Sequence, residues 1–333
     1  MCDRLQHKIQ LPIVLGTHTI TTRASIGIAF GSAQVSPNQL LRNSDIAMYQ
    51  AKANGKGTFA IFEQSLGSET IHRMELEVSL RQALEREEFF LVFQPIVEMN
   101  NSKIRGFEAL LRWQHPDHGL ISPSVFIPIA EEMGIISVLD GWALQRACQQ
   151  LREWKEKYPM LPLTMSVNLS SANFMFANLV GKVIQVLQTT KLSGANLKLE
   201  ITESIVMKDP EESAKVLEKL QQYGVGIVLD DFGTGHSSLS YLHQLPFDGL
   251  KVDRSFVQEA QHSPQSMEII KTIVSLAQGL KLNLIAEGVE TDIQCQMLQA
   301  LGCELGQGYL WWKPLVKNDA DCILAKQVCA EQV

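Results

Sequence analysis

Polar side chains recur along the second part of the chain, each at or near the end of a short apolar run. They are carboxylates, amides and one lysine: Glu108, Asn168, Glu200, Asp230, Asp231, Lys251, Glu287 and Gln307. Acids gathered without a cation would repel one another, and most would have to take up protons. Oxygen ligands without histidine or thiolate favour Mg²⁺ or Mn²⁺ over zinc or copper. The pattern predicts a divalent metal site, provided that the fold brings these residues together.

Asp230 and Asp231 are adjacent in the sequence. One of them could bridge two metal ions while the other serves the second ion, as in two-metal phosphodiester chemistry. Lys251 interrupts an apolar strand, where a lysine is costly unless an anion pairs with it. Either a phosphate ligand or a structural ion pair with Asp253 or Glu290 would satisfy that lysine. Hydrolysis of a phosphate ester is the reaction that the residues favour.

The elements that must position these residues begin at Phe89, where short apolar strands start to alternate with helical stretches. Strands are expected over 89–99, 104–113, 163–170, 197–204, 225–232, 249–256, 282–290 and 304–312. The helices between them are expected over 125–154, 176–190, 209–224, 263–280 and 291–302. This alternation predicts a (β/α)8 barrel of the TIM type, with a doubly wound open sheet as the alternative.

In a (β/α)8 barrel the carboxyl ends of the strands converge on one face, where active sites are built. Alternation along a strand supports this placement, because Leu199 and Ile201 would face the helices while Glu200 faces inward. A single acid at a strand end could instead cap the next helix, and for Glu203 or Asp253 alone that alternative is equally good.

Several polar and aromatic residues near the strand ends have two interpretations. The segment 230–239, DDFGTGHSSL, is either a glycine-rich turn into a helix or a loop that covers the site. His236 and His243 are interpreted as a loop contact and a surface residue. Trp311 and Trp312 could stack on a base, although packing is the favoured interpretation.

Composition limits the function classes. The net charge of −7 argues against a basic nucleic-acid groove. No apolar run is long enough to cross a bilayer, so no membrane contact is expected within this chain. The six cysteines are scattered without a CxxC pair, which predicts reduced thiols in the cytoplasm.

The N-terminal part differs from the rest. Residues 1–66 predict a helix, a β-hairpin, a second helix and a strand, which are too few strands for an independent core. Residues 67–88 carry apolar positions amid charges, as an amphipathic connecting helix would. We therefore expect a truncated α+β fragment at 1–66, a connecting helix at 67–88 and the barrel at 89–333.

The barrel resembles the EAL-domain cyclic di-GMP phosphodiesterases. The triplet Glu108-Ala109-Leu110 stands within FEALLRW, and the other motifs follow in family order: FQPIV, SPSVFIPIAEE, SVNLS, LEITES, LDDFGTGHSSLSYL, LKVDRSFV, IAEGVET and GQGYL-WWKPL. The resemblance implies a (β/α)8-like barrel whose first strand runs antiparallel to the others. It also implies metal-dependent hydrolysis of cyclic di-GMP to linear 5′-pGpG.

The resemblance implies a role for each matching residue. Glu108, Asn168, Glu200 and Asp230 would hold one Mg²⁺ or Mn²⁺. Asp231 and Glu287 would serve a second ion, with Asp230 between the two. Glu287 would be the general base and Lys251 would orient the water or the phosphate, with Glu108 as the third catalytic residue. The remaining assignments are contacts to the nucleotide by Gln94, Leu110, Arg112, Asp253, Glu290 and Gln307, and anchoring of the DDFGTG loop by Glu203.

Departures from the family pattern are mild, namely Val125 for Glu, His236 for Tyr and Trp311-Trp312 for Phe-Ser. A receptor that binds cyclic di-GMP without cutting it is the alternative function, and a phosphodiesterase for another nucleotide is a further one. The resemblance also implies a homodimer formed through the barrel.

Residues 1–66 resemble the C-terminal third of a GGDEF diguanylate-cyclase domain through ASIGIAF, LLRNSDIAMYQAK and GKGTFAIFE. The signature motif and its metal acids are absent, so this chain is not expected to be a cyclase. A longer protein with both domains, anchored to a membrane through upstream segments, is compatible with this pattern.

Overall fold

The computed structural model describes residues 2–15, 18–31, 35–53, 57–174, 178–233 and 245–331. The chain divides into two compact units, Met1–Gln82 and Ala83–Val333. Among the described residues, the helices are too short or too polar to cross a membrane.

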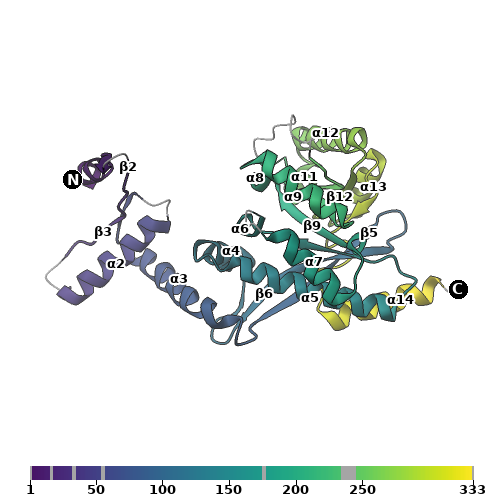
Figure 1. Ribbon diagram of the computed structural model, residues 1–333, viewed down its shortest axis with the longest axis horizontal. Coiled ribbons are helices and arrows are strands. Elements are labelled where there is room, and N and C mark those ends of the chain that lie inside the picture. The colour runs from purple at the N-terminus through teal and green to yellow at the C-terminus, as the bar shows by residue number, and fades with distance from the viewer. Residues whose placement is uncertain are drawn as a thin grey trace. The chain divides into compact units, whose positions relative to one another are not determined.

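The N-terminal unit combines small sheets with helices (Figure 1). Its elements are α1 (Cys2–Ile9), β1 (Ile13–Leu15), β2 (His18–Ile20), β3 (Ile26–Ile28), α2 (Pro37–Ala53), β4 (Phe59–Ile61) and α3 (Gln64–Ala83). Strands β1 and β2 form an antiparallel hairpin, whereas β3 and β4 pair in parallel. Gly27 lets β3 approach α2 closely, because a Cβ atom there would lie 1.9 Å from the carbonyl oxygen of Ser44.

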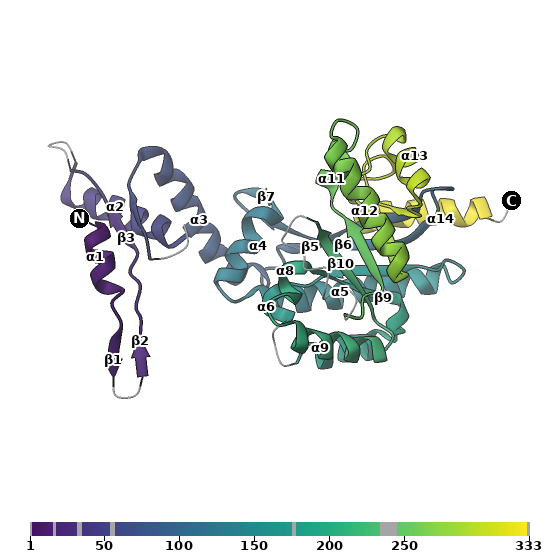
Figure 2. The ribbon, with the colours of Figure 1, turned by 90° about the horizontal axis from the view of Figure 1, so that it is seen from above.

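The second unit is built on a closed ring of eight strands within its described residues (Figure 2). Around the ring the order is β5-β13-β12-β11-β10-β9-β8-β6, and pairing of β5 with β6 closes it. The strands are β5 (Phe89–Glu98), β6 (Ile104–His115), β8 (Thr164–Asn168), β9 (Leu197–Thr202), β10 (Gly226–Phe232), β11 (Gly249–Val252), β12 (Asn283–Ala286) and β13 (Leu305–Gly306). The short strand β7 (Gly119–Ile121) pairs with β6 outside the ring.

The first strand of the ring, β5, runs antiparallel to both of its neighbours, β6 and β13. The other neighbouring pairs of the ring run parallel. The predicted TIM-like barrel with an antiparallel first strand is confirmed, and the open-sheet alternative is wrong.

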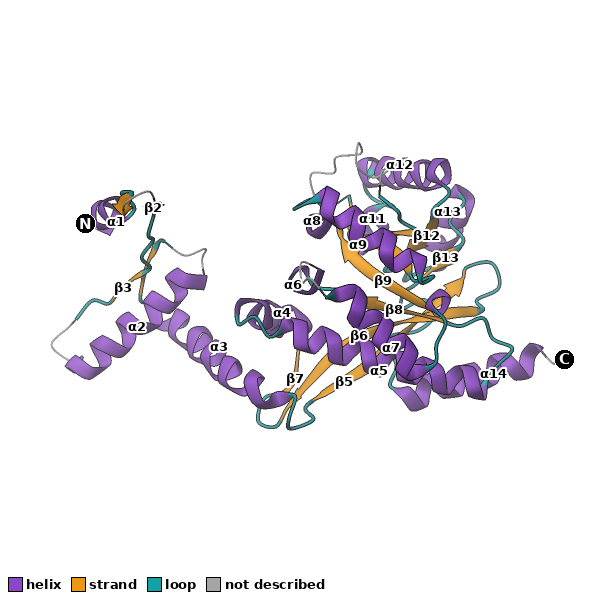
Figure 3. Cartoon of the chain, in the orientation of Figure 1, coloured by secondary structure: helices purple, strands orange, loops and turns teal. Residues whose placement is uncertain are grey.

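Helices surround the strands, as Figure 3 shows by colour. They are α4 (Pro123–Glu132), α5 (Ile136–Lys157), α6 (Ser171–Phe174), α7 (Leu179–Thr190), α8 (Glu203–Val206), α9 (Pro210–Gln222), α11 (Arg254–Glu259), α12 (Pro264–Leu280), α13 (Asp292–Leu301) and α14 (Lys317–Glu331), with a 3-10 turn at Gly194–Asn196. The helix expected over 125–154 is in fact two, because Gly134 takes a positive φ of 70° between α4 and α5.

Alternation along the strands places apolar side chains between the strands and the helices. Leu197, Leu199 and Ile201 of β9 are buried in the hydrophobic core, as their spacing predicts. In the same core, Trp154 of α5 packs against Phe93 and Phe107, with ring centroids 4.9 and 4.6 Å apart. This packed layer leaves the opposite side chains of the strands free to face the inside of the ring.

Candidate active site

Lys251 lies at the centre of the polar cluster inside the ring. Its side chain is fully buried, and its ammonium forms ion pairs with carboxylates from four other strands or strand ends. The Nζ atom lies 2.7 Å from Glu200, 3.3 Å from Glu108 and 3.5 Å from Asp230, and it also contacts Glu287. The fold thus brings together residues that are up to 179 positions apart (287 − 108).

Amide side chains complete the cluster around Glu108. Asn168 at the end of β8 donates to Glu108 Oε1 at 2.7 Å, and Gln307 donates to Glu108 Oε2 at 2.7 Å. The same Gln307 nitrogen also lies 3.0 Å from Gln94 Oε1 on β5. Both oxygens of the Glu108 carboxylate therefore accept hydrogen bonds, which fixes its orientation.

The cluster holds more negative than positive charge, and this sets its electrostatics. Burial raises the pKa of Glu200 well above its ordinary value, and the neighbouring Glu108 carboxylate adds to the rise. Burial likewise raises the pKa of Glu287 to about 7, although Lys251 opposes the shift. The pKa of Lys251 is raised well above its usual range: burial alone would lower it, but the acids outweigh burial. The ammonium is therefore held in its charged form.

Glu108 behaves differently from its acidic neighbours. Burial alone would raise its pKa, but the Lys251 ammonium and the hydrogen bonds from Gln307 and Asn168 leave the pKa of Glu108 below its ordinary value. Glu108 is thus held ionised, whereas Glu200 and Glu287 are favoured to take up protons.

The end of β10 is bent where the two adjacent aspartates stand. The register with β11 shifts between Leu229 and Phe232, and Asp231 takes a positive φ of 55°. Such irregularities redirect side chains near functional sites. Burial and the charges of Asp230 and Asp253 raise the pKa of Asp231, so its carboxylate feels both neighbouring acids.

The cluster opens into a cavity of about 330 Å³. Of the residues predicted to contact a nucleotide, Gln94, Leu110, Glu290 and Gln307 line this cavity. The other lining residues were not predicted from the sequence; they are Arg254, Gln258, Gly288, Gly308 and Tyr309. Three of them, Arg254, Gly288 and Gly308, directly follow a predicted site residue. Tyr309 lies two residues after Gln307, and Gln258 lies one helical turn after Arg254, so the signal was proximity in sequence.

The oxygen ligands of the cluster suit a divalent cation, although its carboxylates surround the ammonium of Lys251. Within the described residues, no group of three or more His, Cys, Asp or Glu side chains stands in an arrangement that could hold a metal ion. Glu200 Oε1 is nevertheless buried without a hydrogen-bond partner, which makes it an orphaned carboxyl oxygen. Oxygen donors of this kind suit Mg²⁺ or Mn²⁺.

Comparison with known families gives two matches. The profile described as the EAL domain matches residues 77–314, and that of the diguanylate cyclase, GGDEF domain, matches residues 1–58. The chain belongs to the EAL-domain family. It carries a partial GGDEF domain before its EAL domain, as its sequence motifs predict.

The relatives include named cyclic di-GMP enzymes. The chain is 42% identical over 317 residues to the bifunctional diguanylate cyclase/cyclic di-GMP phosphodiesterase MucR of Pseudomonas aeruginosa, covering 95% of this chain and 46% of MucR. It is 39% identical over 320 residues to the cyclic di-GMP phosphodiesterase NbdA of the same organism, covering 95% of this chain and 40% of NbdA. The chain thus spans less than half the length of these two curated relatives.

A solved structure shares the fold at similar identity. The PaMucR phosphodiesterase, in complex with c-di-GMP, is 45% identical, with a TM-score of 0.70 over 72% of this chain and 97% of that one. The EAL domain of Mycobacterium smegmatis DcpA is 32% identical, with a TM-score of 0.63 over 72% of this chain and 98% of that one.

Some predicted residues of the EAL domain lie outside the cavity lining. Asp253 caps α11, accepting from the backbone N–H of Ser255 at 2.9 Å, so the helix-cap interpretation of this acid is confirmed. Arg112 is half-buried and donates to the carbonyl oxygen of Leu111 at 2.8 Å. Lys251 pairs with neither Asp253 nor Glu290, the partners expected for a structural ion pair. Among the described residues it pairs instead with the four acids described above.

The loop after β10 can be compared with its prediction only in part. Glu203 is buried at the start of α8, and its role as the loop anchor stays a prediction. The loop residues 234–244, with His236 and His243, lie outside the described residues. Trp311 and Trp312 pack against the hydrophobic core, which confirms the packing interpretation.

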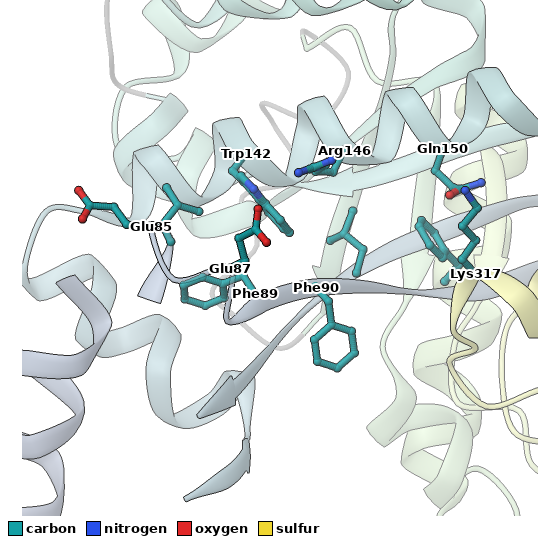
Figure 4. Close-up of a pocket in the computed structure, with 11 residues that line it drawn as sticks. Glu85, Glu87, Phe89, Phe90, Trp142, Arg146, Gln150 and Lys317 are labelled. Carbon is teal, nitrogen blue, oxygen red and sulfur yellow. The ribbon is translucent and has the colours of Figure 1, made fainter. Parts of the chain in front are cut away.

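A second cavity of about 530 Å³ lies between β5, α5 and the start of α14 (Figure 4). Aromatic side chains, among them Phe89 and Trp142, line much of it. The Arg146 guanidinium lies 5.8 Å from the centre of the Trp142 ring, and Lys317 pairs with Glu153. Gln94 and the acids of the cluster do not line this cavity.

Proposed function

We infer that this EAL domain hydrolyses cyclic di-GMP to linear 5′-pGpG with Mg²⁺ or Mn²⁺. The observation that carries the proposal is the arrangement of Glu108, Glu200, Asp230 and Glu287 around Lys251 at the ends of the barrel strands, opening into a cavity. Named cyclic di-GMP phosphodiesterases at about 40% identity support the same substrate.

Two ions are proposed. Glu108, Asn168, Glu200 and Asp230 would hold one, while Asp231 and Glu287 would serve the second, with Asp230 between them. Such ions, when bound, polarise a phosphoryl oxygen and make water a stronger nucleophile. The orphaned Glu200 oxygen and the excess of acids over ammonium groups support a binding site for cations.

The residues of the chain have distinct tasks in this proposal. Glu287 lines the cavity and takes the proton of the attacking water as general base. Lys251 orients the water or the phosphate from its central position. Glu108 is held by Asn168 and Gln307 in an orientation that it keeps through the reaction.

Substrate contacts fall to residues at the rim and the wall of the cavity. Gln94, Leu110, Glu290 and Gln307 would contact the nucleotide directly. Arg112 and Asp253 remain proposed nucleotide contacts beyond the cavity wall, and Glu203 remains the proposed anchor of the DDFGTG loop. A homodimer through the barrel also remains a proposal.

The deciding experiment incubates the purified chain with cyclic di-GMP and Mg²⁺ or Mn²⁺ and separates the products by chromatography. We expect pGpG that disappears with EDTA and with Glu108→Ala. If the nucleotide binds but stays intact with both metals, the phosphodiesterase proposal is refuted for this chain and a binding domain is the function instead.

A further inference from the structure

Asp140 is a buried acid outside the cluster, and the proposed chemistry does not use it. It lies on α5, and its side chain is only 9% exposed. No Lys or Arg forms an ion pair with it in the part of the chain that the structure describes. A buried carboxylate without a cation must be compensated by hydrogen bonds.

The hydrogen bonds of Asp140 go to the segment that follows β8. Its Oδ2 atom accepts from the backbone N–H of Ser170 at 3.0 Å and from the Ser170 hydroxyl at 2.5 Å. That hydroxyl in turn accepts from the backbone N–H of Asn173 at 3.3 Å, so Ser170 also caps α6. The Ser170 hydroxyl is thereby fixed as both a donor and an acceptor.

Ser170 lies two residues after Asn168, the last residue of β8. The intervening Leu169 is buried, and its N–H donates to the carbonyl oxygen of Glu200 at 2.9 Å. Asn168 itself is exposed at the mouth of the ring, where, among the described residues, its amide is held by its bond to Glu108. The hydrogen bonds from Ser170 to Asp140 therefore limit how far the backbone of Asn168 can move.

We propose that Asp140 is a positioning residue that keeps Asn168 directed at Glu108 by fixing Ser170. The inference rests on the proposed function, in which Asn168 and Glu108 bind the same ion. Residues that orient metal ligands from behind typically change metal affinity or activity by about 10–100-fold when they are replaced. Replacement of Asp140 must therefore weaken metal binding, whereas replacement of a residue that only stabilises the fold would leave the metal affinity unchanged.

The test compares Asp140→Ala with Gln150→Ala, which is a matched control. Gln150 lies on the same helix with 8% exposure, and its amide bonds to Glu153 of that helix rather than to the β8 segment. Mn²⁺ affinity is measured by calorimetry, and kcat and KM for cyclic di-GMP are measured over a range of Mn²⁺ concentrations. Thermal unfolding of the metal-free proteins reports on the fold.

We expect Asp140→Ala to raise the Kd for Mn²⁺ about tenfold, and saturating Mn²⁺ to restore most of its activity. Gln150→Ala should keep the Kd of the wild type. Asp140→Asn keeps one acceptor oxygen and should be intermediate. If Asp140→Ala does not fold, Ser170→Ala takes its place, since it removes only the hydroxyl and keeps the backbone bond.

A variant that unfolds at a lower temperature but binds Mn²⁺ like the wild type would refute the positioning role. The same applies to Ser170→Ala if its Mn²⁺ affinity is unchanged. Wild-type protein that binds no Mn²⁺ would instead refute the proposed metal-dependent function, so the two failures are distinguishable.

Discussion

Lys251 Nζ lies 2.7 Å from Glu200 Oε2, and both side chains are fully shielded from solvent. Removing two charges from water is costly, and a buried pair repays that cost only when its geometry is good. Here one ammonium faces the carboxylates of Glu200, Glu108, Asp230 and Glu287. The lysine therefore neutralises only part of the cluster and leaves a site that favours further cations.

Replacement of the lysine tests this balance of charge. Lys251→Met should lower the free energy of unfolding of the metal-free protein by about 3–5 kcal/mol, because it leaves buried carboxylates without their cation. Added Mn²⁺ should raise the stability of the variant more than that of the wild type, since the ammonium no longer competes for the same oxygens. Urea denaturation with EDTA and with Mn²⁺ measures both effects.

An exposed lysine is the control for this prediction. Lys271 pairs with Glu268 three residues earlier on α12, and both side chains are largely exposed. Such pairs contribute about 0–1 kcal/mol, so Lys271→Met should change stability little with or without Mn²⁺. If Mn²⁺ raises the stability of both variants and of the wild type equally, the Lys251 ammonium and Mn²⁺ do not compete for the same carboxylate oxygens.

Among the described residues, Arg254 is the cation of the cavity lining, and it packs beside Gly288, the residue after Glu287. Cyclic di-GMP carries two phosphates, and in the proposed reaction the carboxylate cluster with its ions would accommodate the reacting one. Arg254→Ala should raise KM for cyclic di-GMP about tenfold with little change in kcat, because a charge-assisted hydrogen bond to the other phosphate is lost.

Arg146→Ala is the matched control for Arg254→Ala, since Arg146 lines the second cavity instead. Steady-state kinetics with cyclic di-GMP should give the wild-type KM for the control. A small substrate with a single phosphodiester, bis(p-nitrophenyl) phosphate, should not distinguish Arg254→Ala from the wild type. A loss of activity on that substrate would assign Arg254 to the chemical step instead.

The pH dependence of stability follows from Asp140. Burial raises the pKa of this carboxyl above its usual 3.8, against hydrogen bonds from Ser170 and Asn173, and the nearby Glu131 charge adds to the rise. The folded state therefore holds the proton to a higher pH than the unfolded state does. The contribution of Asp140 to the free energy of unfolding is largest below its pKa in the unfolded state. It falls as the pH rises through the pKa of Asp140 in the folded state.

Denaturation of wild type and Asp140→Asn at several pH values isolates this contribution, because other carboxyls titrate in both proteins. The free energy of unfolding of the wild type, minus that of the variant, should decrease as the pH rises from the unfolded pKa of Asp140. A difference that stays constant across that range would mean that the carboxyl titrates alike in both states.

The sequence was sufficient to predict the acids that meet inside the ring, because alternation along β9 and the ends of parallel strands fix which side chains face inward. It also placed Lys251 among anions. The partners expected for a structural ion pair, Asp253 or Glu290, were wrong, since pairing with Glu108 and Glu200 depends on side-chain geometry across strands.

Other features could not be predicted because they depend on backbone geometry beyond periodicity. The segment 249–256 carries a strand pattern, yet Asp253 caps a helix that begins at Arg254. That turn brings Arg254 to the cavity. The bond from Asp140 to Ser170 joins a helix to a loop 30 residues away, and no local pattern indicates such a pair.

Gly308 links two cavity residues, Gln307 and Tyr309, where the backbone is closely packed. A Cβ atom there would lie 2.0 Å from the carbonyl oxygen of Val289, so Gly308→Ala must displace the chain. We expect a loss of about 3 kcal/mol in stability, with a lower affinity for cyclic di-GMP.

Gly279→Ala is the control, because an added Cβ meets nothing within 4 Å on α12. It should gain up to about 1 kcal/mol, since alanine favours helix more than glycine does, and keep the affinity of the wild type. Urea denaturation measures the stability, and nucleotide titration measures the affinity for cyclic di-GMP. A Gly308→Ala protein as stable as the wild type would show that the backbone at Val289 can move without a loss of stability.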